Sequence, residues 1–279
     1  MNLLPTDLEN MTNVRVMSIT GAGISVGSGL PTYRGVDGHY TDIVKELKRP
    51  IEEIVSLNTL KKEPEVLWRH WHHLLLSLQS AVPSAAHHAL KRIGDACGDY
   101  LELTQNVDGL SLAAGLDRSC LVEIHGSTHS FSCFRCGAKH QLDITEDMEL
   151  PPRCYECKRP AQAPIRPDVV LFGEDIRQDN FNKALRHARS TNLLIISGTT
   201  LQFAYLIDFI SAAALNSAKI LYVDPQASVD NPMLYYVPSQ LEIHSKIHCI
   251  KNTADEVLPK IATYLESRAP LAGLVKAIL

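Results

Sequence analysis

The sequence predicts an α/β fold in which a doubly wound parallel sheet carries a second, smaller domain. Three observations lead to this prediction. Short apolar runs that end in polar residues or glycine recur along the chain, amphipathic helical patterns lie between many of them, and four cysteines stand close together in two pairs. Strand, polar turn and helix in repetition are typical of a doubly wound sheet, where ligands bind at the carboxyl ends of the strands.

The composition limits the size of the core and the kinds of partner that the protein can have. The chain has 279 residues, of which 45% are hydrophobic and 21% charged, so it can bury one large core and a small additional domain. The 27 Lys and Arg residues, set against 31 Asp and Glu, form no basic run, so we expect no nucleic-acid and no membrane partner. No apolar run approaches the roughly 18 residues of a membrane span, and the pattern predicts a soluble, cytoplasmic protein.

Hydrophobic periodicity locates the elements. The predicted strands are residues 14–19, 100–103, 121–124, 169–172, 193–196, 219–223 and 247–250. The predicted helices are residues 65–78, 84–96, 180–188, 201–215 and 254–267. We expect Thr253 and Glu256 to form a capping box at the start of the last helix. Residues 33–60 are polar and turn-rich, which indicates a mobile loop over a ligand. Most of the histidines at 70, 72, 73, 87 and 88 are expected on solvent-exposed helix faces.

A glycine-rich stretch directly follows the first predicted strand. Gly21 and Gly23 leave room for backbone N–H groups to close on a pyrophosphate, which predicts a dinucleotide site. The third glycine, Gly27, comes one residue later than in the ordinary fingerprint, and no acid ends a second strand about 20 residues on. These differences disfavour a hydride-transfer dehydrogenase.

Two Cys-x-x-Cys pairs, Cys133 with Cys136 and Cys154 with Cys157, are separated by 17 residues. This spacing predicts a zinc ribbon with a closed structural site, with a redox pair as the alternative. The stretch from 133 to 157 holds three basic residues against five acidic ones, which argues against a nucleic-acid-binding ribbon. The remaining cysteines, Cys97, Cys120 and Cys249, are expected to be buried free thiols.

Several motifs taken together resemble the sirtuins, and specifically a bacterial-type single-domain member of that family of NAD-dependent protein-lysine deacylases. They follow one another in the family's order between about residues 14 and 260: Gly-Ala-Gly-Ile-Ser (21–25), Pro-Thr-Tyr-Arg-Gly (31–35), Thr-Gln-Asn-Val-Asp-Gly-Leu (104–110), Glu-Ile-His-Gly (123–126), the two cysteine pairs, Pro-Asp-Val-Val-Leu-Phe-Gly-Glu (167–174) and Gly-Thr-Thr (198–200). The resemblance implies a Rossmann-like NAD-binding domain made of residues 1–32, 82–127 and 168–279. It also implies a small domain made of a helical insert, 33–81, and the zinc ribbon, 128–167.

The resemblance also implies an activity: acyl groups, acetyl first, are removed from protein lysines with consumption of NAD, giving nicotinamide and O-acyl-ADP-ribose. The partner would be an acyl-lysine protein substrate. His125 matches the family's general base, and an imidazole suits that role near neutral pH. Asn106 and Asp108 match the residues that hold the nicotinamide ribose and the nicotinamide amide, and Gln105 matches a further ribose contact.

The resemblance assigns the site residues as follows. Catalytic roles fall to His125 and Asn106, and zinc would be held by Cys133, Cys136, Cys154 and Cys157. NAD would be bound by Gly21, Ala22, Gly23, Ile24, Ser25, Thr32, Tyr33, Arg34, Gln105, Asn106, Val107, Asp108, Gly198, Thr199, Thr200, Asp224 and Ala254. The chain departs from the family's pattern at Gly27 (Glu in relatives), Tyr33 (Phe), Ser111 (His), Phe203-Ala204-Tyr205 (Val-x-Pro) and Asp224 (Asn).

Two other functions remain open. On the same scaffold, a mono-ADP-ribosyltransferase or an NAD glycohydrolase would let another nucleophile or water take the ribose carbon. A catalytically inactive NAD-sensing or zinc-ribbon interaction module is the third hypothesis. The presence of Asn106, Asp108 and His125 argues against an inactive module.

The predicted helix 65–78 resembles the part of the sirtuin small domain that lines the acyl pocket. Relatives that prefer succinyl groups carry Tyr-x-x-Arg there, and the corresponding residues here are the apolar Trp71 and Leu74. Arg69 is turned about 200° away from that face, so the pocket is expected to accept neutral acyl groups. The alternative is that the apolar stripe simply packs on the core.

Overall fold

The computed structural model describes residues 14–33, 38–157 and 162–279. Its main feature is a six-stranded sheet with the order β3-β2-β1-β7-β8-β9, in which every neighbouring pair is parallel. The strands are β1 (Arg15–Thr20), β2 (Asp99–Thr104), β3 (Leu121–Glu123), β7 (Leu193–Ser197), β8 (Lys219–Val223) and β9 (Ile247–Ile250). The strand order reverses between β1 and β7, which is the place where doubly wound sheets bind ligands. The predicted fold class is confirmed.

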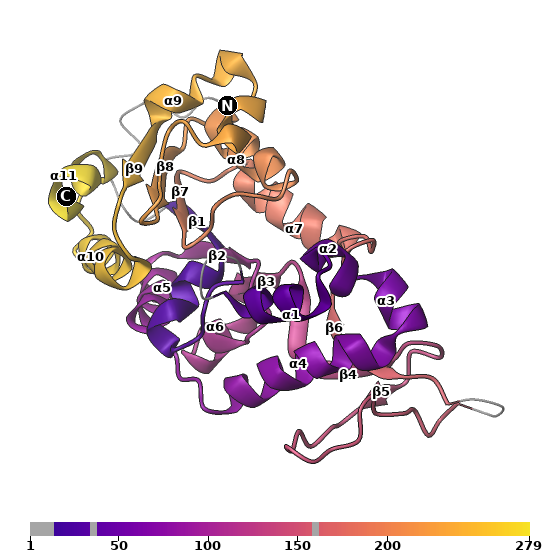
Figure 1. The fold of residues 1–279 in the computed structure, drawn as a ribbon. Helices are drawn as coiled ribbons and strands as arrows, with labels where there is room; N and C mark the ends of the chain where they lie inside the picture. Colours follow the sequence, from indigo (N-terminus) through magenta and orange to yellow (C-terminus); the bar gives the residue numbers. More distant parts are fainter. Residues whose placement is uncertain (1–13, 34–37, 158–161) are drawn as a thin grey trace.

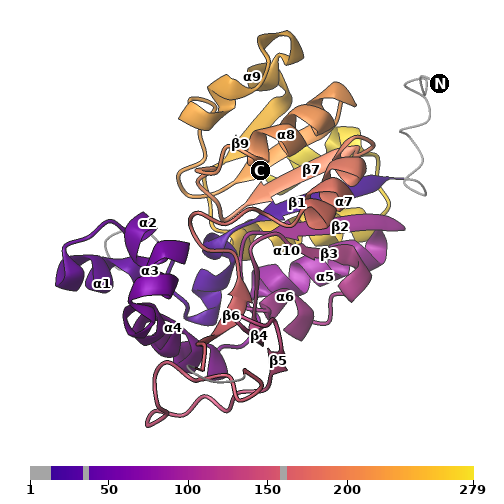
Figure 2. The ribbon, with the colours of Figure 1, turned by 90° about the vertical axis from the view of Figure 1, so that its right-hand side faces the viewer.

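Helices cover both faces of this sheet, as Figure 2 shows. The helices are α5 (Ala85–Ala96), α7 (Gln178–Ala188), α8 (Leu206–Leu215), α10 (Ala254–Glu266) and α11 (Leu274–Ile278), with the short α6 (Leu110–Ala113) and α9 (Ile243–Lys246) between them. In β1, Met17 and Ile19 face the hydrophobic cluster with α7 and α8, while Val16 faces the cluster with α5 and α10. Burial on both faces explains why the strands are continuous apolar runs.

A second group of elements, which we call the small lobe, lies beside the large sheet (Figure 1). It consists of α1 (His39–Leu47), α2 (Ile51–Ile54), α3 (Leu57–Lys62), α4 (Pro64–Gln79) and an antiparallel sheet of β4 (Gly126–Cys133), β5 (Lys139–His140) and β6 (Ile165–Val169). Trp68 is fully buried in its hydrophobic cluster. The indole stacks on Phe131 and donates a 2.7 Å hydrogen bond to the Ile165 carbonyl, so Trp68 holds α4 against both long strands.

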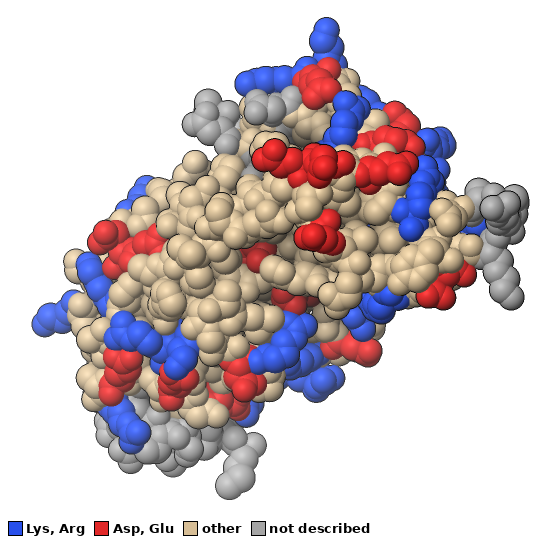
Figure 3. All heavy atoms as spheres, turned by 90° about the horizontal axis from the view of Figure 1, so that it is seen from below, with Lys and Arg blue, Asp and Glu red and all other residues tan. Residues whose placement is uncertain are grey.

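The surface carries charges of both signs. On the face in Figure 3, lysines and arginines are interspersed with aspartates and glutamates. Within the described ranges, no helix is both long and apolar enough to cross a membrane. The absence of a nucleic-acid partner stays a prediction.

The prediction of a loop over residues 33–60 is wrong for most of that segment, because α1, α2 and α3 lie there. Residues 34–37 lie outside the described residues. Ile51, Ile54 and Leu60 are buried in the cluster around Trp68. The tertiary contacts of these few apolar residues therefore outweigh the polar composition of the segment.

Three other local predictions are wrong. The apolar run at 169–172 does not join the parallel sheet, since its strand is β6, which ends at Val169 and pairs antiparallel with β4. Helix α8 begins at Leu206 rather than at 201, because Leu201 has a left-handed backbone with φ 58°. Thr253 precedes α10, but its side chain makes no capping hydrogen bond.

Two expectations about single residue types are only partly met. His87 is 1% exposed instead of lying on a wet face, because its Nδ1 accepts from the Ser84 backbone N–H in a capping box at the start of α5. Cys97 is a buried free thiol, whereas Cys120 and Cys249 are free but half-buried.

The four paired cysteines meet in the small lobe. Their sulfur atoms all lie within 4.8 Å of one another, with 3.4 Å between Cys133 and Cys157 and 3.8 Å between Cys136 and Cys154. A tetrahedron of Zn–S bonds of about 2.3 Å places its sulfurs about 3.8 Å apart, so the cluster fits zinc. All four ligand positions are protein thiols, which makes the site structural.

We predict that Cys154→Ser will remove the zinc and unfold the small lobe. Cys154 is fully buried beside the other thiols, and structural zinc contributes on the order of 10–16 kcal/mol of apparent binding free energy in peptides. Zinc content per chain and thermal unfolding would be measured together.

The matched control is Cys120→Ser, which removes a thiol outside the cluster and should keep both zinc and stability. One zinc per chain and an unchanged unfolding midpoint in Cys154→Ser would contradict a structural metal.

Candidate active site

The site forms where the ends of β1 and β7 meet. The Gly21 N–H donates to the Ser197 carbonyl at 3.1 Å, and the Gly23 N–H donates to the Gly198 carbonyl at 2.8 Å. A Cβ on Gly23 would lie 2.5 Å from the Gly198 Cα, and Gly198 itself has a φ of +63°. Side chains at these positions would therefore force the two loops apart.

The glycine-rich stretch continues as a single 3-10 helix, Ala22–Ser28, which ends at Gly29 in a left-handed conformation. Ile24 and Ser25 are buried, Ala22 is half-buried, and Thr32 and Tyr33 are half-buried where the described stretch ends. Arg34 lies outside the described residues, so its assignment to a diphosphate stays a prediction.

The end of β2 brings two amides to the same place. Gln105 donates from Nε2 to the Thr20 carbonyl and to Thr199 Oγ1, both at 3.0 Å. Asn106 donates from Nδ2 to the Gly21 carbonyl at 3.1 Å and to Ser25 Oγ at 3.2 Å. The Asn106 Oδ1 atom is buried and has no hydrogen-bond partner among the described residues. A buried acceptor of this kind fits a hydroxyl or amide donor of a ligand.

Asp108 is half-buried on the loop that follows. Its carboxylate accepts from Ser25 Oγ at 2.7 Å and from the Leu110 backbone N–H at 3.0 Å. Val107, also predicted to contact the cofactor, uses its carbonyl to accept from the Thr128 backbone and hydroxyl. The carboxylate keeps further lone pairs with which it can accept from an amide NH₂.

His125 follows β3 and precedes β4. Its Nδ1 lies 2.8 Å from the Gln105 carbonyl oxygen, which can only accept, so Nδ1 carries the proton and Nε2 is the basic nitrogen. Burial lowers the pKa of His125, and the hydrogen bond to Gln105 opposes that shift. The imidazole is therefore neutral at pH 7, which is the form that a general base needs.

Two aromatic rings that the family's motifs do not assign to the site lie against His125. Phe203 is 5.0 Å away between ring centroids, and the Tyr205 hydroxyl lies 2.8 Å from Nε2. Both belong to the Phe203-Ala204-Tyr205 departure from the family pattern. The unusual segment was thus visible in the sequence, but its contact with a residue 80 positions away was not.

The ends of β7 and β8 carry the remaining predicted residues. Thr199 is buried, and its carbonyl accepts from the Tyr222 hydroxyl at 3.1 Å, whereas Thr200 is exposed. Asp224 is 8% exposed, accepts from the Gln226 N–H at 2.8 Å, and has its pKa raised by burial. Ala254 is buried at the start of α10. These residues border the strand ends, while Gly27 lies against Asp255 of α10.

Ser111 stands where relatives carry histidine. Its hydroxyl donates to Glu102 Oε1 at 3.0 Å, and the Thr20 hydroxyl donates to the same oxygen at 2.7 Å. Glu102 is fully buried within β2, and burial raises its pKa to about 7. The hydroxyl at this departure therefore hydrogen-bonds to a buried acid in β2, the strand that leads to Gln105 and Asn106.

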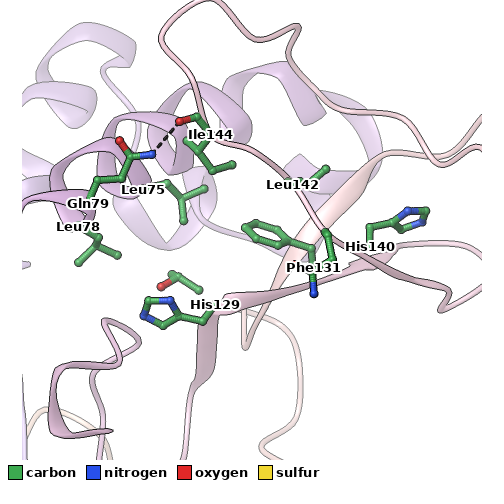
Figure 4. Close-up of a pocket in the computed structure, with 10 residues that line it drawn as sticks. Leu75, Leu78, Gln79, His129, Phe131, His140, Leu142 and Ile144 are labelled. Atoms are coloured by element: carbon green, nitrogen blue, oxygen red, sulfur yellow. Dashed lines mark hydrogen bonds between the residues drawn. The ribbon is translucent and has the colours of Figure 1, made fainter. Parts of the chain in front are cut away.

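A cavity of about 240 Å³ lies between α4 and β4 (Figure 4). Leu75 and Leu78 of α4 face His129 and Phe131 across it, and the His129 Nε2 lies 2.8 Å from the Asp108 carbonyl. Trp71 is not among the residues that line it; the side chain is 2% exposed and packs edge-on against Trp68. For Trp71 the structure thus favours the core-packing alternative.

Comparison with known proteins agrees with these motifs. The model of the Sir2 family matches residues 21–204. An NAD-dependent protein deacylase 2 of Pseudomonas aeruginosa is 35% identical over 196 residues, covering 70% of this chain and 75% of that protein. An NAD-dependent protein deacylase of Aquifex aeolicus is 30% identical over 216 residues, covering 77% and 85%.

Solved structures agree at the level of the fold. One, from work on the structural basis for the mechanism and regulation of Sir2 enzymes, has a TM-score of 0.71 at 27% identity and covers 94% of this chain and 97% of that one. A Sir2 homologue in complex with NAD has a TM-score of 0.74 at 23% identity, covering 95% of each chain. The chain belongs to the Sir2 family, the sirtuins that its motifs resemble.

Proposed function

We propose that this protein is an NAD-dependent protein-lysine deacylase that removes acetyl groups first and yields nicotinamide and O-acyl-ADP-ribose. The observation that carries the proposal is the pairing, at one sheet edge, of a neutral His125 base with the open acceptor of Asn106. Its relatives, which are named as deacylases, support the reaction class.

NAD fits the residues at the switch point. The buried Asn106 Oδ1 needs a donor, and it lies beside the glycine turn, because the Asn106 Nδ2 donates to the Gly21 carbonyl. The residues proposed to hold NAD are Gly21, Ala22, Gly23, Ile24, Ser25, Thr32, Tyr33, Arg34, Gln105, Asn106, Val107, Asp108, Gly198, Thr199, Thr200, Asp224 and Ala254. When bound, NAD supplies a ribose carbon that takes up the acyl oxygen as nicotinamide leaves, and a ribose hydroxyl that receives the acyl group.

The chain's own residues bind and orient NAD and take up a proton. Asn106 accepts from a ribose hydroxyl with Oδ1, because its Nδ2 is already committed to Gly21 and Ser25. Asp108 accepts from the nicotinamide amide while Ser25 holds its carboxylate. His125 takes up a proton at Nε2, and the Gln105 carbonyl stabilises the imidazolium that results.

We also propose the two-domain division given by the resemblance, with residues 1–32, 82–127 and 168–279 binding NAD and residues 33–81 and 128–167 forming the small domain. The separate hydrophobic cluster around Trp68 supports it. Four thiols gathered at one metal site favour a reducing compartment, so we propose the cytoplasm as the location.

The test of the proposed function incubates the protein with NAD, alone and with an acetyl-lysine peptide, and reads the products by mass. Nicotinamide and O-acetyl-ADP-ribose that form only with the peptide support a deacylase. Nicotinamide released without the peptide would favour a mono-ADP-ribosyltransferase or NAD glycohydrolase on the same scaffold.

We predict that His125→Ala lowers deacylation by a factor on the order of 100 to 10,000, the usual contribution of a positioned acid or base. NAD binding, measured by calorimetry, should stay near that of the wild type. His88→Ala, an exposed histidine on α5, serves as the control and should leave both unchanged. Turnover by His125→Ala close to the wild-type rate would remove this residue from the mechanism.

The pH profile should follow the neutral imidazole of His125. Burial disfavours the imidazolium and lowers the pKa below the ordinary value of about 6.5, so the active form persists through neutral pH. We expect kcat/KM to be flat between about pH 7 and 8 and to fall below about pH 6.5 as the base becomes protonated. An acid limb with its midpoint above pH 7 would contradict a base whose pKa is lowered.

We predict that acetyl-lysine peptides are used in preference to succinyl-lysine peptides. A buried succinyl carboxylate needs a cationic partner, and Arg69 is exposed on α4, where it pairs with Glu46 at 3.5 Å. The measurement is kcat/KM on one peptide carrying either group. A succinyl preference would mean that a cation from another helix or strand reaches the acyl pocket.

A further inference from the structure

The Tyr205 hydroxyl occupies the only acceptor of His125. The Nδ1–H of His125 is committed to the Gln105 carbonyl, which leaves Nε2 as the single nitrogen with an in-plane lone pair. The Tyr205 hydroxyl lies 2.8 Å from that nitrogen and donates to it. Any other hydroxyl that gives a proton to His125 must either displace Tyr205 or pass the proton through it.

The Tyr205 ring is fixed by its neighbours. Phe203 stacks on it with centroids 5.7 Å apart and 25° between the planes, and Phe209 meets it nearly at a right angle at 6.3 Å. Its backbone forms the N-cap of α8, where the Asp208 N–H donates to the Tyr205 carbonyl at 3.3 Å. Displacing the hydroxyl by moving the ring would break these contacts together with the hydrogen bond, which disfavours displacement.

A tyrosine hydroxyl can accept and donate at the same time. Its oxygen has two lone pairs and one proton, so it can accept from a second hydroxyl while it donates to Nε2. Burial raises the pKa of Tyr205, which keeps the phenol protonated and ready to donate at neutral pH. The arrangement has the order of a relay: an outer hydroxyl, then Tyr205, then His125.

We propose that Tyr205 is a further catalytic residue that carries the proton from the ribose hydroxyl to His125, an inference that rests on the proposed deacylase function. The ribose O–H bond breaks as the Tyr205 oxygen takes that proton, and the phenolic proton moves to Nε2. Tyrosine ends neutral, His125 ends as imidazolium, and the ribose oxygen keeps the electron pair with which it attacks the acyl carbon. The imidazolium gives its proton to solvent after the product leaves, which restores the neutral base.

Two other roles make different predictions. If Tyr205 only packed against His125 and Phe203, losing its hydroxyl would change nothing while its ring remained. If the hydroxyl merely blocked Nε2 until substrate arrived, losing it would speed the reaction. The relay alone predicts that acyl transfer slows while the earlier departure of nicotinamide, which needs no base, continues.

The test variant is Tyr205→Phe, which keeps the ring and its stacking. In ligand-free protein with ¹⁵N-labelled histidine, the Nε2 resonance of His125 should shift in the variant because its hydrogen bond is lost. With NAD and an acetyl-lysine peptide, exchange of labelled nicotinamide into NAD should stay within about twofold of the wild type. Formation of O-acetyl-ADP-ribose should fall by about 100-fold, the lower end of what a positioned proton-transfer group contributes.

The matched control is Tyr236→Phe, which removes a hydroxyl from an exposed tyrosine and should change none of these readings. An unshifted Nε2 resonance, faster product formation, or an equal fall in exchange and product would each overturn the relay. Wild-type protein that forms no product with NAD and peptide would overturn the proposed function and the relay with it. An active wild type with an equally active Tyr205→Phe would overturn the relay alone.

Discussion

The backbone contact between the Gly21–Gly23 turn and Gly198 fixes the geometry of the whole site. A Cβ on Gly21 would lie 2.7 Å from the Gly198 carbonyl oxygen, and one on Gly198 would lie 2.5 Å from the Ile24 nitrogen. These distances leave no space for a side chain on either loop. The two loops pack tightly against each other at the point where the strand order reverses. Polar groups that hydrogen-bond to these loops are therefore held in fixed positions.

The polar groups of the site are ordered through this contact before any ligand arrives. Gln105 bridges the ends of β1 and β7, and Asn106 bonds to the Gly21 carbonyl. Ser25, in turn, bonds to both Asn106 and Asp108. The amide donors of Asn106 are used up in this network while its Oδ1 stays open. A ligand hydroxyl therefore meets an acceptor that needs no reorganisation, which is the condition for strong electrostatic stabilisation.

The sequence predicted the large sheet well and the local exceptions poorly, for physical reasons. A parallel strand buried on both faces is a continuous apolar run, which periodicity detects even without partners. The run at 169–172 has the same appearance, but its pairing with β4 depends on the chain returning from the cysteine cluster. In the site, the motif residues could be placed, whereas the contact of Tyr205 with His125 joins residues 80 positions apart and leaves no local pattern.

Glu102 explains one of the departures from the family's pattern, and the explanation requires the three-dimensional structure. A fully buried carboxyl in the middle of β2 is unfavourable when ionised, and burial raises its pKa to about 7. The hydroxyls of Thr20 and Ser111 both donate to Oε1, which limits that shift, while Oε2 has no partner among the described residues. Ser111, one of the departures from the family's pattern, thus donates a hydrogen bond to this buried acid. Since the folded-state pKa is raised, folding favours the protonated form, and this acid destabilises the fold more as the pH rises from its ordinary pKa of about 4.5 through 7. The strand that leads to Gln105 and Asn106 therefore contains a carboxyl whose charge state changes near neutral pH. Two hydroxyls hold this carboxyl in place, and one of them belongs to β1, the strand that precedes the glycine turn.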